Sequence, residues 1–163
     1  MRALQTIALL LVLSACATGA GSGAQDCTEI GTPVGIGLDI EPPLATKVAK
    51  ATVEACWDGS CRTSAVELLP STAPGPTTCV GDVCSAEVRP TQGKNGFADM
   101  AGLPRKSVNV TVTLADEAGA TLVRRSLEVT PQMQFPNGPD CPGGGPQAQV
   151  VVSGEGTVSP RGW

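Results

Sequence analysis

Apolar and other residues alternate strictly along one short stretch in the first third of the chain. Two faces result, one apolar (Val34, Ile36, Leu38, Ile40) and one small or acidic (Gly35, Gly37, Asp39, Glu41). A period of two residues is typical of a strand with one face against a core. Pro42-Pro43 end the pattern, because proline gives no backbone donor to a ladder. We therefore predict a strand that ends near Ile40.

The same pattern recurs further along the chain. Residues 47–57 and 107–114 alternate, and 122–129 do so except at Arg124-Arg125, where we expect a bulge. A last strand is expected near residues 147–152. Short strands separated by turn signals, without a convincing helix after the first residues, predict an all-β fold, an antiparallel β-sandwich. The architecture resembles immunoglobulin-like and fibronectin-like domains.

Two segments with identical cysteine spacing predict hairpins closed by disulfides. Cys56 and Cys61 flank an Asp-Gly turn, and Cys79 and Cys84 flank a Gly-Asp turn that favours type II′. In each hairpin the two residues that flank the turn form one cross-strand pair, and the two cysteines form the next pair. At that pair antiparallel strands approach most closely. A Cα separation between about 4.5 and 5.5 Å would suit a disulfide.

Two segments rich in proline are expected to be irregular. Residues 69–78 form a connection that could be mobile, and residues 131–146 form a long loop rich in Pro and Gly. Cys141 would hold that loop, by elimination through a third disulfide to Cys27.

The first sixteen residues have the order of an export signal. Met1-Arg2 is a short positive end, residues 3–13 are mostly apolar, and Leu13-Ser14-Ala15-Cys16 has small residues at a cleavage position. This segment resembles the lipobox signal of bacterial lipoproteins, which implies cleavage before Cys16 and a diacylglycerol on its thiol. Residues 1–15 are then a signal peptide, 16–26 the lipidated cysteine with a flexible tether, and 27–163 the folded domain.

The cysteine count is consistent with that interpretation. The chain has seven cysteines, an odd number. Lipidation of Cys16 leaves six for three disulfides, which form in an oxidising compartment. We therefore expect the protein outside the cytoplasm, anchored to the cell membrane by its N-terminal lipid. An unlipidated, secreted form is the alternative.

Composition narrows the possible chemistry. The net charge is −4, so a nucleic-acid partner is not expected. The chain has no histidine and no tyrosine, so the commonest acid-base residue is missing and we expect no catalysis. No cofactor or metal site is predicted, and the cysteine pairs favour disulfides over zinc.

Three segments together resemble parts of actinobacterial lipoproteins: residues 27–31, the 56–61 hairpin and residues 135–141. The resemblance implies the domain class and no activity. We expect a binding or structural module whose contacts lie on residues 70–78 and 131–146, with an envelope protein or a glycan as partner. The alternative is a Ca²⁺-dependent carbohydrate-binding module, or an envelope enzyme, that uses Asp39, Glu41 and loop carboxylates such as Asp140.

Overall fold

The structure is a computed structural model that describes residues 27–162. The proposed signal peptide, Cys16 and the tether lie outside the described residues. Within them the chain forms ten strands and one 3-10 turn, and no α-helix. The elements are β1 (Gly35–Ile40), η1 (Leu44–Thr46), β2 (Lys50–Trp57), β3 (Ser60–Val66), β4 (Leu69–Val80), β5 (Val83–Asp99), β6 (Val108–Ala115), β7 (Thr121–Val129), β8 (Gln132–Met133), β9 (Pro146–Val152) and β10 (Val158–Arg161).

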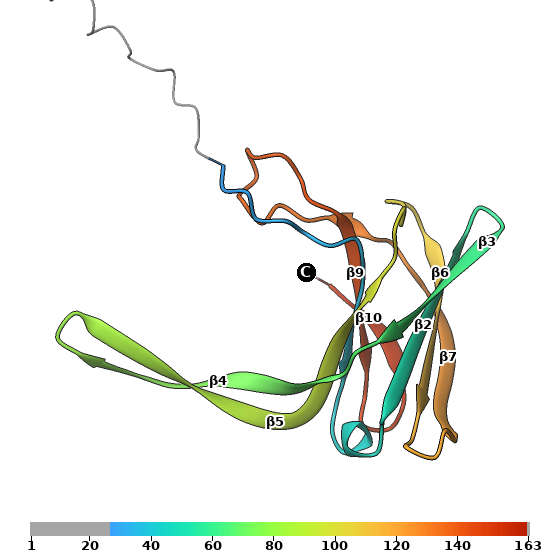
Figure 1. Cartoon of the computed structure of the whole chain (residues 1–163), viewed down its shortest axis with the longest axis horizontal. Coiled ribbons are helices and arrows are strands. Elements are labelled where there is room, and N and C mark those ends of the chain that lie inside the picture. Colours follow the sequence, from blue (N-terminus) through green and yellow to red (C-terminus); the bar gives the residue numbers. More distant parts are fainter. Residues whose placement is uncertain (1–26, 163) are drawn as a thin grey trace, which may run out of the picture.

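Two sheets pack face to face, which confirms the predicted all-β sandwich (Figure 1). One has the strand order β10-β9-β1-β5-β4, with β8 beside β9, and the other has the order β3-β2-β6-β7. One pairing differs from the predicted antiparallel arrangement, because β1 and β9 are parallel. Parallel neighbours need a long connection between them, and more than a hundred residues separate these two strands in the chain. The first sheet is therefore mixed.

The alternating residues of β1, β2 and β6 form the core, as predicted. Ile36, Leu38, Val53, Val110 and Val112 are fully buried. Branched aliphatic residues and alanine dominate the rest of the core, and none of its fully buried members is aromatic. Close packing of the two sheets thus depends on small side chains, which leave little tolerance for added volume.

Two local predictions need correction, and one strand was not predicted. The strand expected from residue 47 begins at Lys50, since η1 precedes it. The irregularity in β7 lies at Leu122, not at Arg124-Arg125, because Leu114 pairs with Val123 and Ala115 with Thr121. Arg125 pairs with Val112 in regular register. Its side chain is exposed, and β7 is an edge strand of its sheet. The strand β10 was not foreseen, because it is short and contains Pro160.

The largest correction concerns residues 69–78, which are not an irregular connection. They form most of β4, which pairs with β5 as a long two-stranded hairpin that leaves the sandwich (Figure 1). Proline is compatible with extended backbone on an edge strand, and β5 supplies the hydrogen-bonding partner that the local composition did not reveal. We call residues 72–90 of this hairpin the arm.

Candidate contact surfaces

The arm is the most exposed part of the described chain. Every residue from 76 to 92 is exposed, and β1 pairs only with the other part of β5, residues 94–99. At its end lie Val80 and Val83, which are 85% and 74% exposed. They face each other across the turn. Two large apolar side chains are thus held at the end of a projecting hairpin, away from the core.

The turn of the arm follows the sequence prediction. Cys79 and Cys84 form a disulfide with a Cα separation of 4.0 Å. Gly81 has φ +61° and Asp82 has no positive φ, the pattern of a type II′ turn. An isolated two-stranded hairpin is marginally stable in water, so the disulfide helps to keep the arm paired.

A bulge and a few hydrogen bonds fix the root of the arm. Gln92 has φ +62°, and here β5 has two more residues than β4 between paired positions. Thr91 Oγ1 donates to the carbonyl oxygen of Ser71 at 3.1 Å, and Asn95 Nδ2 donates to Ser71 Oγ at 3.1 Å. A bulge bends a strand and increases its twist. The direction of the arm is therefore set by this short segment.

Prolines lie on both strands of the arm. Pro74 is opposite Val88, and Pro90 is opposite Thr72. Proline cannot donate to a neighbouring strand, and natural edge strands use it to prevent further strand addition. The prolines therefore disfavour the addition of a further strand to either edge of the arm.

A second projecting surface consists of residues 27–34 and 131–146, which we call the lobe. Cys27 and Cys141 form the third disulfide, as expected, with a Cα separation of 5.8 Å. Asn137 Nδ2 also donates to the carbonyl oxygen of Ile30 at 3.3 Å. The loop is irregular apart from β8, a two-residue strand that the sequence did not suggest. These links join two segments that are distant in the chain.

The lobe also exposes apolar side chains. Ile30 is 58% and Phe135 is 48% exposed. Phe135 lines a groove of about 330 Å³ together with Pro131, Met133 and Arg105. Thr130 and Gln132 also line it, so the groove combines apolar side chains, polar side chains and one cation.

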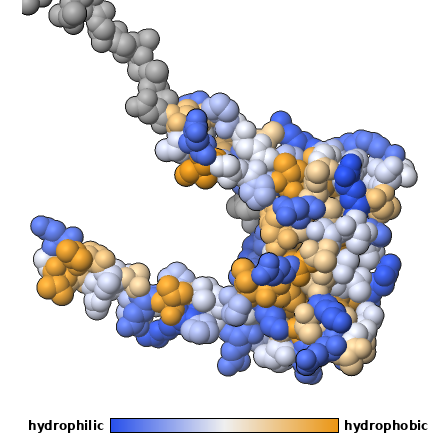
Figure 2. Space-filling view, in the orientation of Figure 1, coloured by the Kyte–Doolittle hydropathy of each residue, from blue (hydrophilic) through white to orange (hydrophobic). Residues whose placement is uncertain are grey.

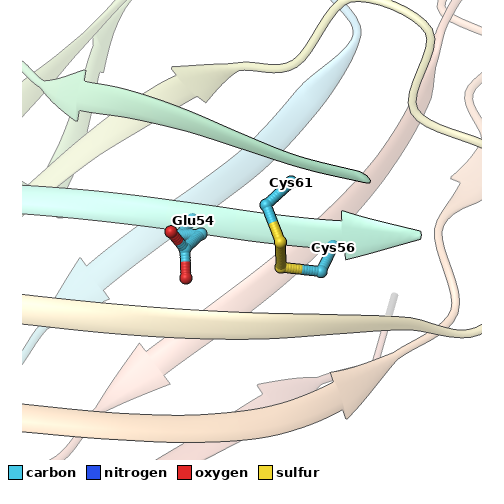
Figure 3. A group of neighbouring side chains, drawn as sticks. All are labelled: Glu54, Cys56 and Cys61. Atoms are coloured by element: carbon cyan, nitrogen blue, oxygen red, sulfur yellow. A yellow bond between two sulfur atoms is a disulfide. The ribbon is translucent and has the colours of Figure 1, made fainter. Parts of the chain in front are cut away.

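The first stapled hairpin lies within the sandwich. Asp58 and Gly59 both have positive φ, as a type I′ turn requires. The Cα atoms of Cys56 and Cys61 are 4.0 Å apart, closer than the range expected from strand pairing alone. Glu54 lies beside this disulfide (Figure 3). Because both sulfurs are bonded to each other, they do not offer thiolates to a metal.

Asp39 and Glu41, the carboxylates considered for Ca²⁺, border the same groove, of about 440 Å³. Asp39 Oδ2 accepts hydrogen bonds from Gln149 Nε2 at 2.9 Å and from Arg161 Nη1 at 2.6 Å. The Arg161 guanidinium therefore neutralises the negative charge of Asp39, which a calcium site would need. Asp140 is an exposed residue of the lobe, and does not line this groove.

A further groove, of about 460 Å³, lies next to it on the first sheet. Gly37 contributes no side chain there. The lining combines the polar side chains of Asp39, Asn95 and Gln149 with the apolar side chains of Leu69 and Phe97. The sequence prediction named only Asp39 of these residues. The small, non-apolar face of β1 was the available signal in the sequence.

Comparison of the chain with protein-family models, with curated proteins and with solved structures gave no match. Within residues 27–162, no helix has the length and apolar character needed to cross a membrane. The features that indicate a function are therefore the arm, the lobe and the sequence of the N-terminal segment.

Proposed function

We propose that the mature protein is a lipid-anchored module outside the cytoplasmic membrane that binds a partner through the arm and the lobe. It acts by contact and not by catalysis. The observation that carries the proposal is the arm, a stapled hairpin that places Val80 and Val83 in solvent. An exposed pair of apolar side chains on a projecting hairpin is typical of a protein contact and adds nothing to the core.

The composition of the arm supports a protein partner rather than a membrane surface. Asp82 lies between the two valines and has no cationic partner among the described residues, whereas Glu87 is paired with Arg89. The end of the arm therefore carries a negative charge. Acidic groups disfavour an anionic lipid surface. Two valines also bury too little apolar area for stable insertion. The lipid on Cys16 would supply the membrane attachment, which leaves the arm free to bind a protein.

The first experiment tests the anchor and the disulfides. Protein from membranes and from culture fluid is alkylated under denaturing conditions, and its intact mass is measured. We expect a membrane-bound chain that begins at Cys16, carries a diacylglyceryl group and takes up no alkylating label. A Cys16→Ser variant should appear only as the unlipidated form. Unlipidated wild-type chain in the culture fluid would instead favour the secreted alternative.

The second experiment tests the arm. A variant in which an Asn-Gly turn joins Thr72 to Pro90 lacks the arm and keeps the sandwich. Crosslinking in intact cells should capture a partner with the wild type and lose it with this variant. Replacing Asp58-Gly59 by Asn-Gly is the matched control, since it changes the turn of the other stapled hairpin. Unchanged partner capture without the arm would contradict the proposal.

The groove beside Gly37 on the first sheet favours a second candidate function, which is glycan binding. Phe97 provides an aromatic ring, and Asn95, Asp39 and Gln149 provide hydrogen-bonding groups. Aromatic rings and amides are suited to the apolar faces and hydroxyl groups of sugars. Calorimetric titration with cell-wall glycan fragments, with and without Ca²⁺, tests this function. We expect Asn95→Ala to abolish the heat of binding if the groove holds a sugar, and Ca²⁺ to leave it unchanged because Arg161 already pairs with Asp39.

A further inference from the structure

The end of the arm and the lobe lie on the same side of the molecule and border one open space. Figure 2 shows apolar side chains at the end of the arm and on the lobe, separated by that space. Figure 1 shows that the arm and the lobe leave the sandwich from different ends. Each chain thus presents two exposed apolar surfaces that do not cover each other.

The two surfaces are complementary in chemistry. The arm end has two valines around an acid, Asp82. The lobe groove has Pro131, Met133 and Phe135 beside a cation, Arg105. Among the described residues, neither Asp82 nor Arg105 forms an ion pair or a side-chain hydrogen bond. An apolar projection with a negative charge therefore matches a groove that offers the apolar side chains of Met133 and Phe135 beside a positive charge.

A second copy of the same chain offers such a groove. Since every copy has both the projection and the groove, two copies related by a two-fold axis would form the contact twice. The prolines on both strands of the arm disfavour pairing between sheet edges, so a side-chain contact remains. We propose that the arm of one copy docks in the lobe groove of a second copy, with Val80 and Val83 against Met133 and Phe135 and Asp82 beside Arg105.

The contact is small, so the expected dimer is weak and depends on concentration. Binding has to offset the lost freedom of two molecules, and only two valines and one ion pair contribute at each contact. Lipid anchoring in one membrane would raise the effective concentration of the copies and favour the dimer. This inference rests on the proposed function for its use of the arm, and adds the identity of the partner.

The experiment is sedimentation equilibrium of the purified mature protein in density-matched detergent over a wide range of concentration. We expect a reversible dimer for the wild type. D82R and R105E should each weaken dimerisation by about tenfold or more, because each places like charges together. The double variant D82R/R105E should recover most of that loss, since the charges are exchanged.

Matched controls separate the arm end from the rest of the arm. E87R reverses a charge and V88S removes an exposed apolar residue, both on the arm but away from its end, and neither should change the dimerisation constant. V80S/V83S should abolish the dimer. A monomer at every concentration would overturn the inference, and so would a dimer that D82R and V80S/V83S leave unchanged. If the purified protein is monomeric while loss of the arm still removes a partner in cells, the inference fails and the proposed function stands.

Discussion

The two hairpins with short-range disulfides have the same local design and different surroundings. Both have four residues between the cysteines, and both have a Cα separation of 4.0 Å. The hairpin at Cys56 and Cys61 continues into β2, where Ala51, Val53 and Ala55 are buried. The hairpin at Cys79 and Cys84 has no buried residue between positions 72 and 92, and every residue from 76 to 92 is exposed. The turn and the disulfide are thus local properties, whereas burial depends on the residues of the adjoining strands.

Because of this difference, the sandwich and the arm should differ in the free energy needed to unfold them. Unfolding the sandwich exposes a core of aliphatic side chains, so changes there affect global stability. The arm buries no large side chain, and its two strands pair only with each other. Its local unfolding needs little free energy and leaves the sandwich intact. Substitutions that act on the sandwich should therefore change global stability more than matched substitutions on the arm.

The largest effect is expected from the disulfide of the lobe. Cys27 and Cys141 are 114 residues apart, whereas Cys56 and Cys61 are five apart. Under the chain-entropy model, closing the longer loop stabilises by about 5 kcal/mol and closing the shorter one by about 2 kcal/mol. We expect Cys27→Ser/Cys141→Ser to lower the melting temperature more than Cys56→Ser/Cys61→Ser. Equal shifts in thermal denaturation would contradict this order.

A core truncation should destabilise the sandwich, while the matched change on the arm should not. Leu38 is fully buried and Val80 is 85% exposed. Leu38→Ala removes packed atoms and leaves a cavity, which costs about 2–5 kcal/mol. Val80→Ala is expected to change stability by less than about 0.5 kcal/mol. Urea denaturation of both variants measures the difference, and a comparable loss for Val80→Ala would show that the arm contributes to the core.

The two short-range disulfides should differ in their effect on melting. Removing the Cys56–Cys61 bond should cost about 2 kcal/mol of global stability. Removing Cys79–Cys84 should leave the melting temperature nearly unchanged, because the arm then gains freedom in the folded state as well as in the unfolded state. Instead, limited proteolysis should cut the Cys79→Ser/Cys84→Ser variant within residues 72–90. An equal fall in melting temperature for both pairs would link the arm to the sandwich.

The smallest effect is expected from surface ion pairs. Arg161 pairs with Asp39 on the sandwich, and Arg89 pairs with Glu87 on the arm at 3.7 Å. Arg161→Met should cost at most about 1 kcal/mol, since exposed pairs contribute little. Arg89→Met should have no measurable effect on the melting temperature. Calorimetric melting at low and high salt checks both variants, and high salt should reduce the difference between Arg161→Met and the wild type.

The sequence was most informative where local pattern and local chemistry agree. Alternation predicted β1, β2 and β6, and the two cysteine pairs predicted both turns, because these features depend on residues close in the chain. The third disulfide followed from elimination. Strand pairing between distant segments, such as the parallel pairing of β1 with β9, could not be predicted from local sequence pattern.

The end of the arm was predicted from its cysteines, but the strand at residues 69–78 was missed because the composition of that segment is ambiguous. Pro70, Pro74 and Pro76 are typical of an irregular connection, and only the pairing with β5 makes the segment a strand. The groove residues Asn95, Phe97 and Gln149 were missed for a related reason. They come from strands that are distant in sequence, and meet only when β5 and β9 pair with β1. Of the candidate residues, Asp39 and Glu41 were correctly placed near each other, but Arg161 was not foreseen.

Hydrogen exchange of the mature protein, followed by mass spectrometry at low and high protein concentration, tests the independence of arm and sandwich most directly. At low concentration, amides of β2 and β6 should exchange only through global unfolding, and amides of residues 72–90 should exchange much faster through local opening. At high concentration, protection should increase at the arm end and the lobe alone. Equal protection of the arm and the sandwich at low concentration would contradict the account, because the arm would then unfold only together with the core.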